Sequence, residues 1–286
     1  MAGSGGGGGG GDVDVDGTAP QRIRGALIDL NGTLHVGDTA TPGSQAALRR
    51  LRDAGVACRF VTNTTKDTIS NLLALVQGLG FDISNQEVFS SLTATRRLLE
   101  ARQLRPFMLL HPKALPDFEG LPTHEPNCVV VGLAKEAFTY ENLNAAARIL
   151  LNDPDAPLIA IHKGRLFKEP DGLSLGPGPF VVALEYATGR VAQVVGKPEA
   201  SFFQLALSDL GCSPGDAVMI GDDARDDVGG AQGAGLRGLV VQTGKFRPGD
   251  EAATGGAPPA ATVRDFAAAV DWILAQNAAA GGVGGG

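Results

Sequence analysis

Cysteine is scarce in this chain, and its pattern excludes a disulfide framework. The three cysteines, Cys58, Cys128 and Cys212, are odd in number, widely spaced and without any C-x-x-C pair. Such usage is typical of buried thiols in a reducing compartment. The chain also lacks an apolar run as long as a membrane span, so we expect no membrane partner.

Basic residues are too few to indicate a nucleic-acid surface. The 24 Lys and Arg stand against 31 Asp and Glu, the net charge is −7, and no basic stripe is present. Electrostatic binding to a phosphate backbone requires the opposite balance, so we expect no nucleic-acid partner. The four histidines are His35, His111, His124 and His162. None has H-x-x-x-H spacing, which disfavours a zinc site.

The two ends of the chain are rich in small residues. Residues 1–18 are Gly-rich and then acidic, with neither the positive nor the apolar region of a signal peptide, so we expect a cytoplasmic protein. Residues 1–20 and 277–286 are predicted to be disordered tails, because they cannot bury enough apolar surface to offset the entropy of ordering.

Short apolar runs alternate with helical patterns through the rest of the chain. Four of these runs end at Asp29, at Thr62 with Asn63, at Asp222, and at residues 242–244. They are short and continuously apolar, as buried parallel strands are. Helical patterns open at Pro42 and Pro198. The alternation predicts an α/β fold with a doubly wound, Rossmann-like parallel sheet.

The middle of the chain, residues 93–192, has apolar patterning of its own. Short apolar runs alternate there with helical patterns near residues 141–151 and 179–188. We interpret this segment as an α/β cap domain. It would be inserted into a discontinuous core formed by residues 21–92 and 193–276.

Polar side chains follow three of the core strands directly. In open α/β sheets, ligands bind at the carboxyl ends of the strands. Asp29, Thr62 with Asn63, and Asp222 are therefore expected to meet at one edge of the sheet. This convergence predicts a functional site.

The segment from Asp29 to Leu34 places a carboxylate directly after a strand. One interpretation is an ordinary turn, in which Asp and Asn supply the turn chemistry. The other is a carboxylate nucleophile on a tight turn, where Gly32 lets the backbone approach an anion.

Four carboxylates follow another strand within six residues. They are Asp222, Asp223, Asp226 and Asp227. Such groups repel one another unless a cation lies among them, and oxygen ligands suit Mg²⁺, which takes one or two carboxylates. The alternative is a solvated acidic turn at a helix start. The apolar run before the cluster favours the metal.

Lys197 lies between Gly196 and a helix-opening Pro198. A lone lysine is usually a solvated charge. In an acidic site, however, it would offset the repulsion between a carboxylate and a phosphate, about 4 kcal/mol at about 4 Å with an effective dielectric constant near 20. The Thr62 hydroxyl could donate to a phosphoryl oxygen, although such residues are also routine helix caps.

With these four motifs in this order, residues 22–250 resemble the haloacid dehalogenase superfamily. The position of the insertion, and residues 176–180 and 183–189 within it, resemble the subgroup with a large α/β cap. The resemblance implies a Mg²⁺-dependent phosphatase that acts on small phosphorylated molecules through an aspartyl-phosphate intermediate. Cap-mediated homodimers occur in that subgroup, so a homodimer is a further expectation.

The resemblance also implies a role for each motif residue. Asp29 would be the nucleophile and a Mg²⁺ ligand, and Asp222 would be the second Mg²⁺ carboxylate. Thr62 with Asn63 would bind phosphate, and Lys197 would be the family lysine. Asp223 and Asp227 would support the site without binding the metal directly.

Asn31 departs from the family pattern. The family normally carries Asp at this position, where its carbonyl binds Mg²⁺ and its side chain is the general acid/base. Asn31 keeps the carbonyl, but an amide cannot transfer a proton, and this loss costs about 10²–10⁴-fold. We expect a slow phosphatase, or one biased toward activated phosphates such as acyl or aryl phosphates.

Two other functions compete with this expectation. A catalytically weak Mg²⁺- and phosphate-binding regulatory module would fit Asn31, although it would be free to lose Asp29, Lys197 and Asp222. A dehalogenase is disfavoured, because those relatives dispense with the Mg²⁺ that the acidic cluster indicates.

Overall fold

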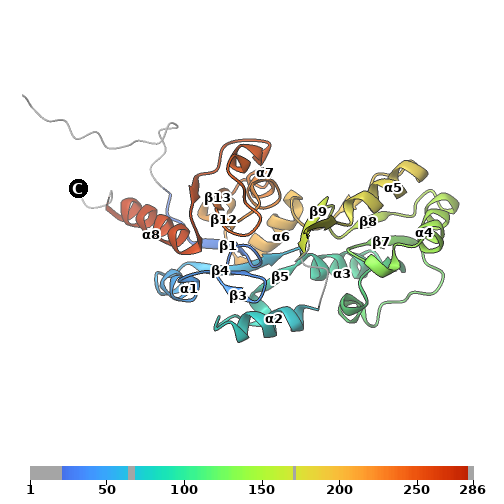
Figure 1. The fold of residues 1–286 in the computed structure, drawn as a ribbon, viewed down its shortest axis with the longest axis horizontal. Helices are drawn as coiled ribbons and strands as arrows, with labels where there is room; N and C mark the ends of the chain where they lie inside the picture. The colour runs from blue at the N-terminus through green and yellow to red at the C-terminus, as the bar shows by residue number, and fades with distance from the viewer. Residues whose placement is uncertain (1–20, 64–67, 170–171, 283–286) are drawn as a thin grey trace, which may run out of the picture.

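A six-stranded parallel sheet forms the centre of the molecule (Figure 1). The computed structural model describes residues 21–63, 68–169 and 172–282. In sheet order the strands are β14 (Ala261–Val263), β13 (Arg237–Val241), β12 (Ala217–Gly221), β1 (Gly25–Asp29), β4 (Ala57–Thr62) and β5 (Val88–Ser90). Every neighbouring pair is parallel. The predicted parallel α/β fold is therefore confirmed.

Helices cover both faces of this sheet. Alternate residues of a strand point to opposite faces, and Ile28 of β1 packs in one core cluster while Leu27 packs in the other. The cluster around Ile28 includes α1 (Ser44–Asp53), α2 (Ile69–Gly78) and α8 (Phe266–Gly282). The cluster around Leu27 includes α3 (Ser91–Ala101), α6 (Ala200–Leu210) and α7 (Gly230–Gly233). The sheet is doubly wound.

A second parallel sheet lies at the end of the molecule opposite α8 (Figure 1). Its order is β11 (Gln193–Val194), β8 (Leu158–Ala160), β7 (Cys128–Val131) and β6 (Pro106–Leu109). Helices α4 (Tyr140–Asn152) and α5 (Gly178–Thr188) pack on this sheet. Strand β11 extends the second sheet two residues past the cap boundary expected at residue 192.

Two hairpins and several short helical segments complete the described chain. The hairpins are β2 (His35–Val36) with β3 (Thr39–Ala40), and β9 (Leu166–Glu169) with β10 (Gly172–Leu175). The short segments are η1 (Asn85–Glu87), η2 (Pro112–Phe118), η3 (Lys135–Ala137), η4 (Pro214–Asp216), η5 (Ala224–Gly229) and η6 (Asp250–Thr254). No helix in the described ranges is long and apolar enough to cross a membrane.

The prediction of a C-terminal tail from residue 277 is wrong for residues 277–282, which belong to α8. Asn277 anchors this part of the helix to the start of the core. Its Oδ1 accepts a hydrogen bond from the Ile23 N–H at 2.7 Å, and its Nδ2 donates to the Ile23 carbonyl at 2.9 Å. The expected tail 1–20 and the last residues of the expected C-terminal tail, 283–286, lie outside the described residues.

Candidate active site

Lys197 joins two carboxylates at the carboxyl edge of the main sheet. Its Nζ lies 2.6 Å from Asp29 Oδ1 and 2.6 Å from Asp227 Oδ1, and all three side chains are buried. Nζ also donates to the Val61 carbonyl at 3.3 Å. Burial alone would lower the pKa of Lys197, but the charges of Asp227 and Asp29 hold it above its usual range. The lysine is therefore charged.

Three carboxylates gather beside this ammonium. Asp29, Asp222 and Asp227 each offer an oxygen, and these oxygens lie within 4.8 Å of one another. Burial, together with the charge of Asp29, raises the pKa of Asp222 to about 7. With all three carboxylates ionised, the cluster would carry more negative charge than Lys197 alone offsets.

The environment of Asp222 fits a bound cation. Its Oδ2 accepts the N–H of Lys245 at 2.8 Å. Its Oδ1 is buried and has no hydrogen-bond donor among the residues that the structure describes. A buried carboxylate oxygen without a partner is costly. A hard divalent cation such as Mg²⁺ prefers oxygen ligands and would satisfy it.

Glycines let the acidic loops approach one another. Gly32 has a φ of 108°, in the left-handed region that favours glycine, and a Cβ atom there would overlap the carboxylate of Asp222. Gly221 lies in the same way against the carboxylate of Asp227. A side chain at either position would push the carboxylates apart.

Asp227 and Asp223 order the loop after β12. Asp227 Oδ2 accepts the N–H of Asp223 at 3.1 Å, while its other oxygen binds Lys197. Asp223 Oδ1 accepts the N–H groups of Arg225 and Asp226 at 2.9 and 2.8 Å, and so caps η5. These contacts support the site from its periphery.

Asn63 holds the backbone of Lys197. Its Nδ2 donates to the Lys197 carbonyl at 2.8 Å, and its Oδ1 accepts the Lys197 N–H at 2.9 Å. Both polar groups of the Asn63 side chain are engaged in this way, and its expected contact with phosphate stays a prediction. Thr62 is buried at the end of β4, beside Val61.

Asn31 follows the nearest carboxylate of the cluster, Asp29, by two positions. Its main chain therefore stays close to Asp29. Its side chain is exposed, and Oδ1 accepts the N–H of Gly37 at 3.4 Å. The structure therefore brings together Asp29, Lys197, Asp222 and Asp227, while the Asn31 side chain is open to solvent.

Lys245 is a site residue that the sequence reasoning missed. Its Nζ pairs with Asp223 Oδ2 at 2.8 Å, and its backbone N–H holds Asp222. The Lys245 side chain is half exposed, and the charges of Asp223 and Asp222 keep its pKa above its usual range. The signal was available, because Lys245 directly follows the polar end of the fourth apolar run.

The second sheet reaches this site through the segment after β8. The Ile161 carbonyl accepts the N–H of Gly196, the residue before Lys197, at 2.8 Å. His162 follows, and its Nδ1 accepts the N–H of Gly164 at 3.3 Å. Burial and the positive charges of Lys245 and Lys197 lower the pKa of His162 to about 4, so its ring is neutral at pH 7.

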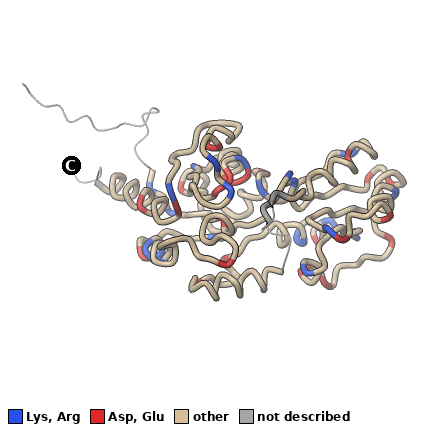
Figure 2. The backbone as a smooth tube through the Cα atoms, in the orientation of Figure 1, with Lys and Arg blue, Asp and Glu red and all other residues tan. Residues whose placement is uncertain are grey.

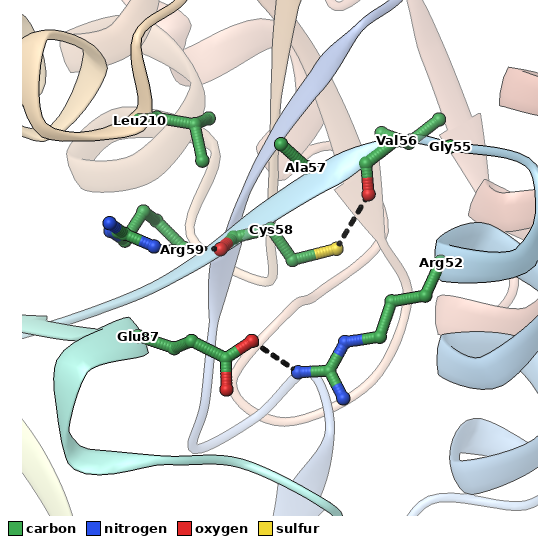
Figure 3. A pocket seen from close by; sticks show the side chains of 8 residues that line it. All are labelled: Arg52, Gly55, Val56, Ala57, Cys58, Arg59, Glu87 and Leu210. Carbon is green, nitrogen blue, oxygen red and sulfur yellow. Dashed lines mark hydrogen bonds and ion pairs between the residues drawn. The ribbon is translucent and has the colours of Figure 1, made fainter.

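A pocket of about 430 Å³ lies at the opposite edge of the sheet, where β4 begins (Figure 3). Arg52 in its wall pairs with Glu87 at 2.5 Å, and Arg59 pairs with Asp209 at 2.7 Å. Burial raises the pKa of the Cys58 thiol to about 11, which leaves it unreactive. With both guanidinium groups already neutralised, this pocket has little to hold an anion.

Acidic and basic residues are interspersed along the described chain (Figure 2). No long stretch of the drawn backbone carries only acidic or only basic residues. The carboxylates that distinguish the site are buried.

Two family models match this chain. Residues 26–121 match a model described as haloacid dehalogenase-like hydrolase, and residues 194–269 match a HAD-hydrolase-like model. The segment between the two matches corresponds largely to the second sheet and its helices.

Curated relatives match over most of the chain. Human haloacid dehalogenase-like hydrolase domain-containing protein 2 is 57% identical over 256 residues, which cover 90% of this chain and 98% of the relative. Phospholysine phosphohistidine inorganic pyrophosphate phosphatase from Danio rerio is 44% identical over 259 residues, with 89% and 96% coverage.

Solved structures share the fold. A 4-nitrophenylphosphatase from Thermotoga maritima has a TM-score of 0.80 and 24% identity, covering 89% of this chain and 98% of its own. A p-nitrophenyl phosphatase from Archaeoglobus fulgidus has a TM-score of 0.81 and 24% identity, covering 88% and 99%. These similarities extend over both sheets.

Proposed function

The chain belongs to the haloacid dehalogenase-like hydrolases, and from this we propose that it is a Mg²⁺-dependent phosphatase acting on small phosphorylated molecules through an aspartyl-phosphate intermediate. One observation carries the proposal. The buried Lys197 ammonium lies 2.6 Å from Asp29 while Asp222 keeps a buried oxygen without a donor among the described residues. This arrangement provides a nucleophile, a cation beside it and a place for a metal.

Asp29, Asp222 and the main-chain carbonyl of Asn31 would hold the Mg²⁺. When bound, the ion would neutralise charge on the phosphoryl oxygens and on the carboxylates. Asp227 has a different role in this proposal, because its two oxygens bind Lys197 and the backbone of Asp223. It fixes the lysine that faces the phosphate.

Asp29 would perform the first chemical step. A carboxylate oxygen of Asp29 forms a bond to phosphorus while the bond from phosphorus to the leaving-group oxygen breaks. Water then attacks the aspartyl-phosphate, which releases inorganic phosphate and restores the carboxylate. Lys197 would offset the repulsion in the first step and stabilise the charge on the phosphoryl oxygens.

The exposed amide of Asn31 bears on the choice of substrate. An amide cannot protonate a departing alkoxide, so leaving groups that need little protonation would react faster. The name of the Danio rerio relative refers to phospholysine, phosphohistidine and inorganic pyrophosphate. The first two contain P–N bonds and the third a P–O–P bond, and these bonds are more reactive than the P–O bond of an alkyl phosphate. We extend the proposal to activated phosphates of this kind.

The second sheet would act as a cap that limits access to the site. We keep residues 93–192 as the core of this cap, extended by β11. The hydrogen bond between Ile161 and Gly196 supports this interpretation, because it ties the cap to the segment that carries Lys197. A cytoplasmic location and a homodimer stay predictions from the sequence.

A Mg²⁺-dependent screen tests the function. The panel would contain acyl phosphates, pyrophosphate, phosphoramidates, p-nitrophenyl phosphate and alkyl phosphates, with Asp29→Asn as the inactive control. Trapping BeF₃⁻ on Asp29, seen by ¹⁹F NMR, tests the nucleophile independently of the substrate. No turnover and no adduct would reject the phosphatase and favour the Mg²⁺- and phosphate-binding module.

A further inference from the structure

The loop after β13 contacts both of the loops that carry the proposed metal ligands. A Cβ atom on Gly244 would collide with Asp222 and with Gly32, and the φ of Gly244 is 57°. Thr243 Oγ1 donates a hydrogen bond to the Gly32 carbonyl. In the sheet, β12 lies between β13 and β1. The loop after β13 therefore reaches past the end of β12 and binds the turn that follows β1.

Lys245 fixes one oxygen of Asp222. Its backbone N–H donates to Oδ2 at 2.8 Å, while its Nζ pairs with Asp223 Oδ2 at 2.8 Å. The other oxygen of Asp222, Oδ1, is the buried atom without a donor among the described residues. Since the two oxygens share one rigid plane, the N–H of Lys245 determines where Oδ1 points.

We propose that residues 243–245 form a positioning loop that aims Oδ1 of Asp222 at the metal and keeps it in register with the turn after Asp29. This inference rests on the Mg²⁺ site of the proposed function. In this role Thr243, Gly244 and Lys245 touch neither metal nor substrate. They act through Asp222 and Gly32, in the way that partners of metal ligands commonly tune affinity.

A purely electrostatic role and a positioning role for Lys245 predict opposite changes in Mg²⁺ affinity when the side chain is removed. The ammonium repels a cation, so its removal by Lys245→Met would tighten Mg²⁺ binding if charge were its only contribution. A positioning role predicts weaker binding, because Asp223 and the loop lose the contact that steadies the Lys245 N–H. Lys245→Arg, which retains the charge and the pairing, should then restore much of the affinity.

Isothermal titration of the full chain with Mg²⁺, without substrate, separates these outcomes. Gly244→Ala should weaken Mg²⁺ binding by about 10–100-fold. Gly211→Ala is the matched control, because Gly211 has a φ of 70° but nothing within 4 Å of an added Cβ. The control should bind Mg²⁺ like the wild type, with a loss of melting temperature from backbone strain alone.

A second pair keeps the test valid if Gly244→Ala fails to fold. Thr243→Val removes the hydroxyl that binds Gly32, and Thr243→Ser keeps it. We expect weaker Mg²⁺ binding for the valine variant only. Wild-type affinity in Thr243→Val, or tighter binding in Lys245→Met, would overturn the positioning loop.

The titration also distinguishes this inference from the proposed function. A wild-type chain that binds Mg²⁺ but hydrolyses no phosphate, with the affinity losses above, would support the loop and reject the phosphatase. If the chain is an active phosphatase whose Mg²⁺ affinity is unchanged by substitutions at 243, 244 and 245, the proposed function is supported and the positioning loop is rejected. A wild-type chain that binds no Mg²⁺ would overturn the positioning loop together with the metal site.

Discussion

Asn63 and Lys197 form a reciprocal pair across 134 residues of sequence, in which the side-chain amide of one binds both backbone polar groups of the other. The pair joins the end of β4 to the segment before α6. It places the Lys197 side chain where its ammonium reaches Asp29. The position of the lysine therefore depends on a residue that has no charge of its own.

Asn63→Ala should lower turnover by about tenfold, because a misplaced Lys197 would lose part of its contact with the transition state, worth about 1.4 kcal/mol. The loss of two hydrogen bonds should also lower the stability by about 1–3 kcal/mol. Asn63→Asp, which keeps the acceptor but loses the donor, should lie between. Steady-state kinetics and thermal unfolding measure both effects, and unchanged turnover in Asn63→Ala would contradict the positioning role.

Lys197→Met should abolish most activity and also destabilise the metal-free protein. Removing one partner of a buried ion pair leaves uncompensated charge, here on Asp29 and Asp227, at a cost of about 3–5 kcal/mol. Mg²⁺ should recover more stability in this variant than in the wild type. Denaturant unfolding with and without Mg²⁺ measures the difference, and an equal response of both proteins would refute the charge argument.

Asn31→Asp should raise the turnover of alkyl phosphates, by up to about 10²-fold, because it restores a group able to transfer a proton. Turnover of acyl phosphates should change much less, since their leaving groups need little protonation. The ratio of kcat for the two substrate classes is the measurement. If alkyl-phosphate turnover stays unchanged, the proton-transfer explanation for Asn31 is wrong.

Mg²⁺ affinity should fall as the pH drops through about 7, because Asp222 must lose its proton to bind the ion and its pKa in the metal-free fold is about 7. In the unfolded chain the same group ionises near pH 4. The folded state therefore binds more protons between about pH 4 and 7, and the stability of the metal-free protein should decrease as the pH rises through this window.

Asp222→Asn is the control for this pH dependence. It has no proton to lose, so this part of the decrease in stability between about pH 4 and 7 should disappear. Melting temperatures measured at low ionic strength, with EDTA and then with Mg²⁺, give both profiles. A metal-free wild type whose stability profile matches that of Asp222→Asn would contradict the raised pKa.

Asn277→Ala should lower the stability by about 1–3 kcal/mol, because the variant loses both hydrogen bonds to the backbone of Ile23 and leaves buried groups unpaired. Gln276→Ala on the same turn of α8 is a control and should change little. Activity should be retained in both variants. Equal stability of the two would show that residues 277–282 contribute as little as a tail.

The strands of the core could be predicted from sequence, because buried parallel strands are short, apolar and ended by polar residues. Runs ending at Asp29, Thr62 and Asp222 became β1, β4 and β12. The short strands β5 and β14 were not predicted, since three residues between helices carry too little pattern. The end of α8 was missed because its Ala-rich composition resembles a tail, and only Asn277 reveals the docking.

The sequence by itself determined the family, the parallel sheet and the set of carboxylates near its carboxyl edge, because each depends on local composition and on motif order. Only the tertiary structure decided which of these groups contact one another. It placed Lys197 between Asp29 and Asp227, left the Asn31 side chain open to solvent and brought the Lys245 N–H against Asp222. These relationships join residues far apart in the chain, and their geometry depends on packing and hydrogen bonding that no local pattern encodes.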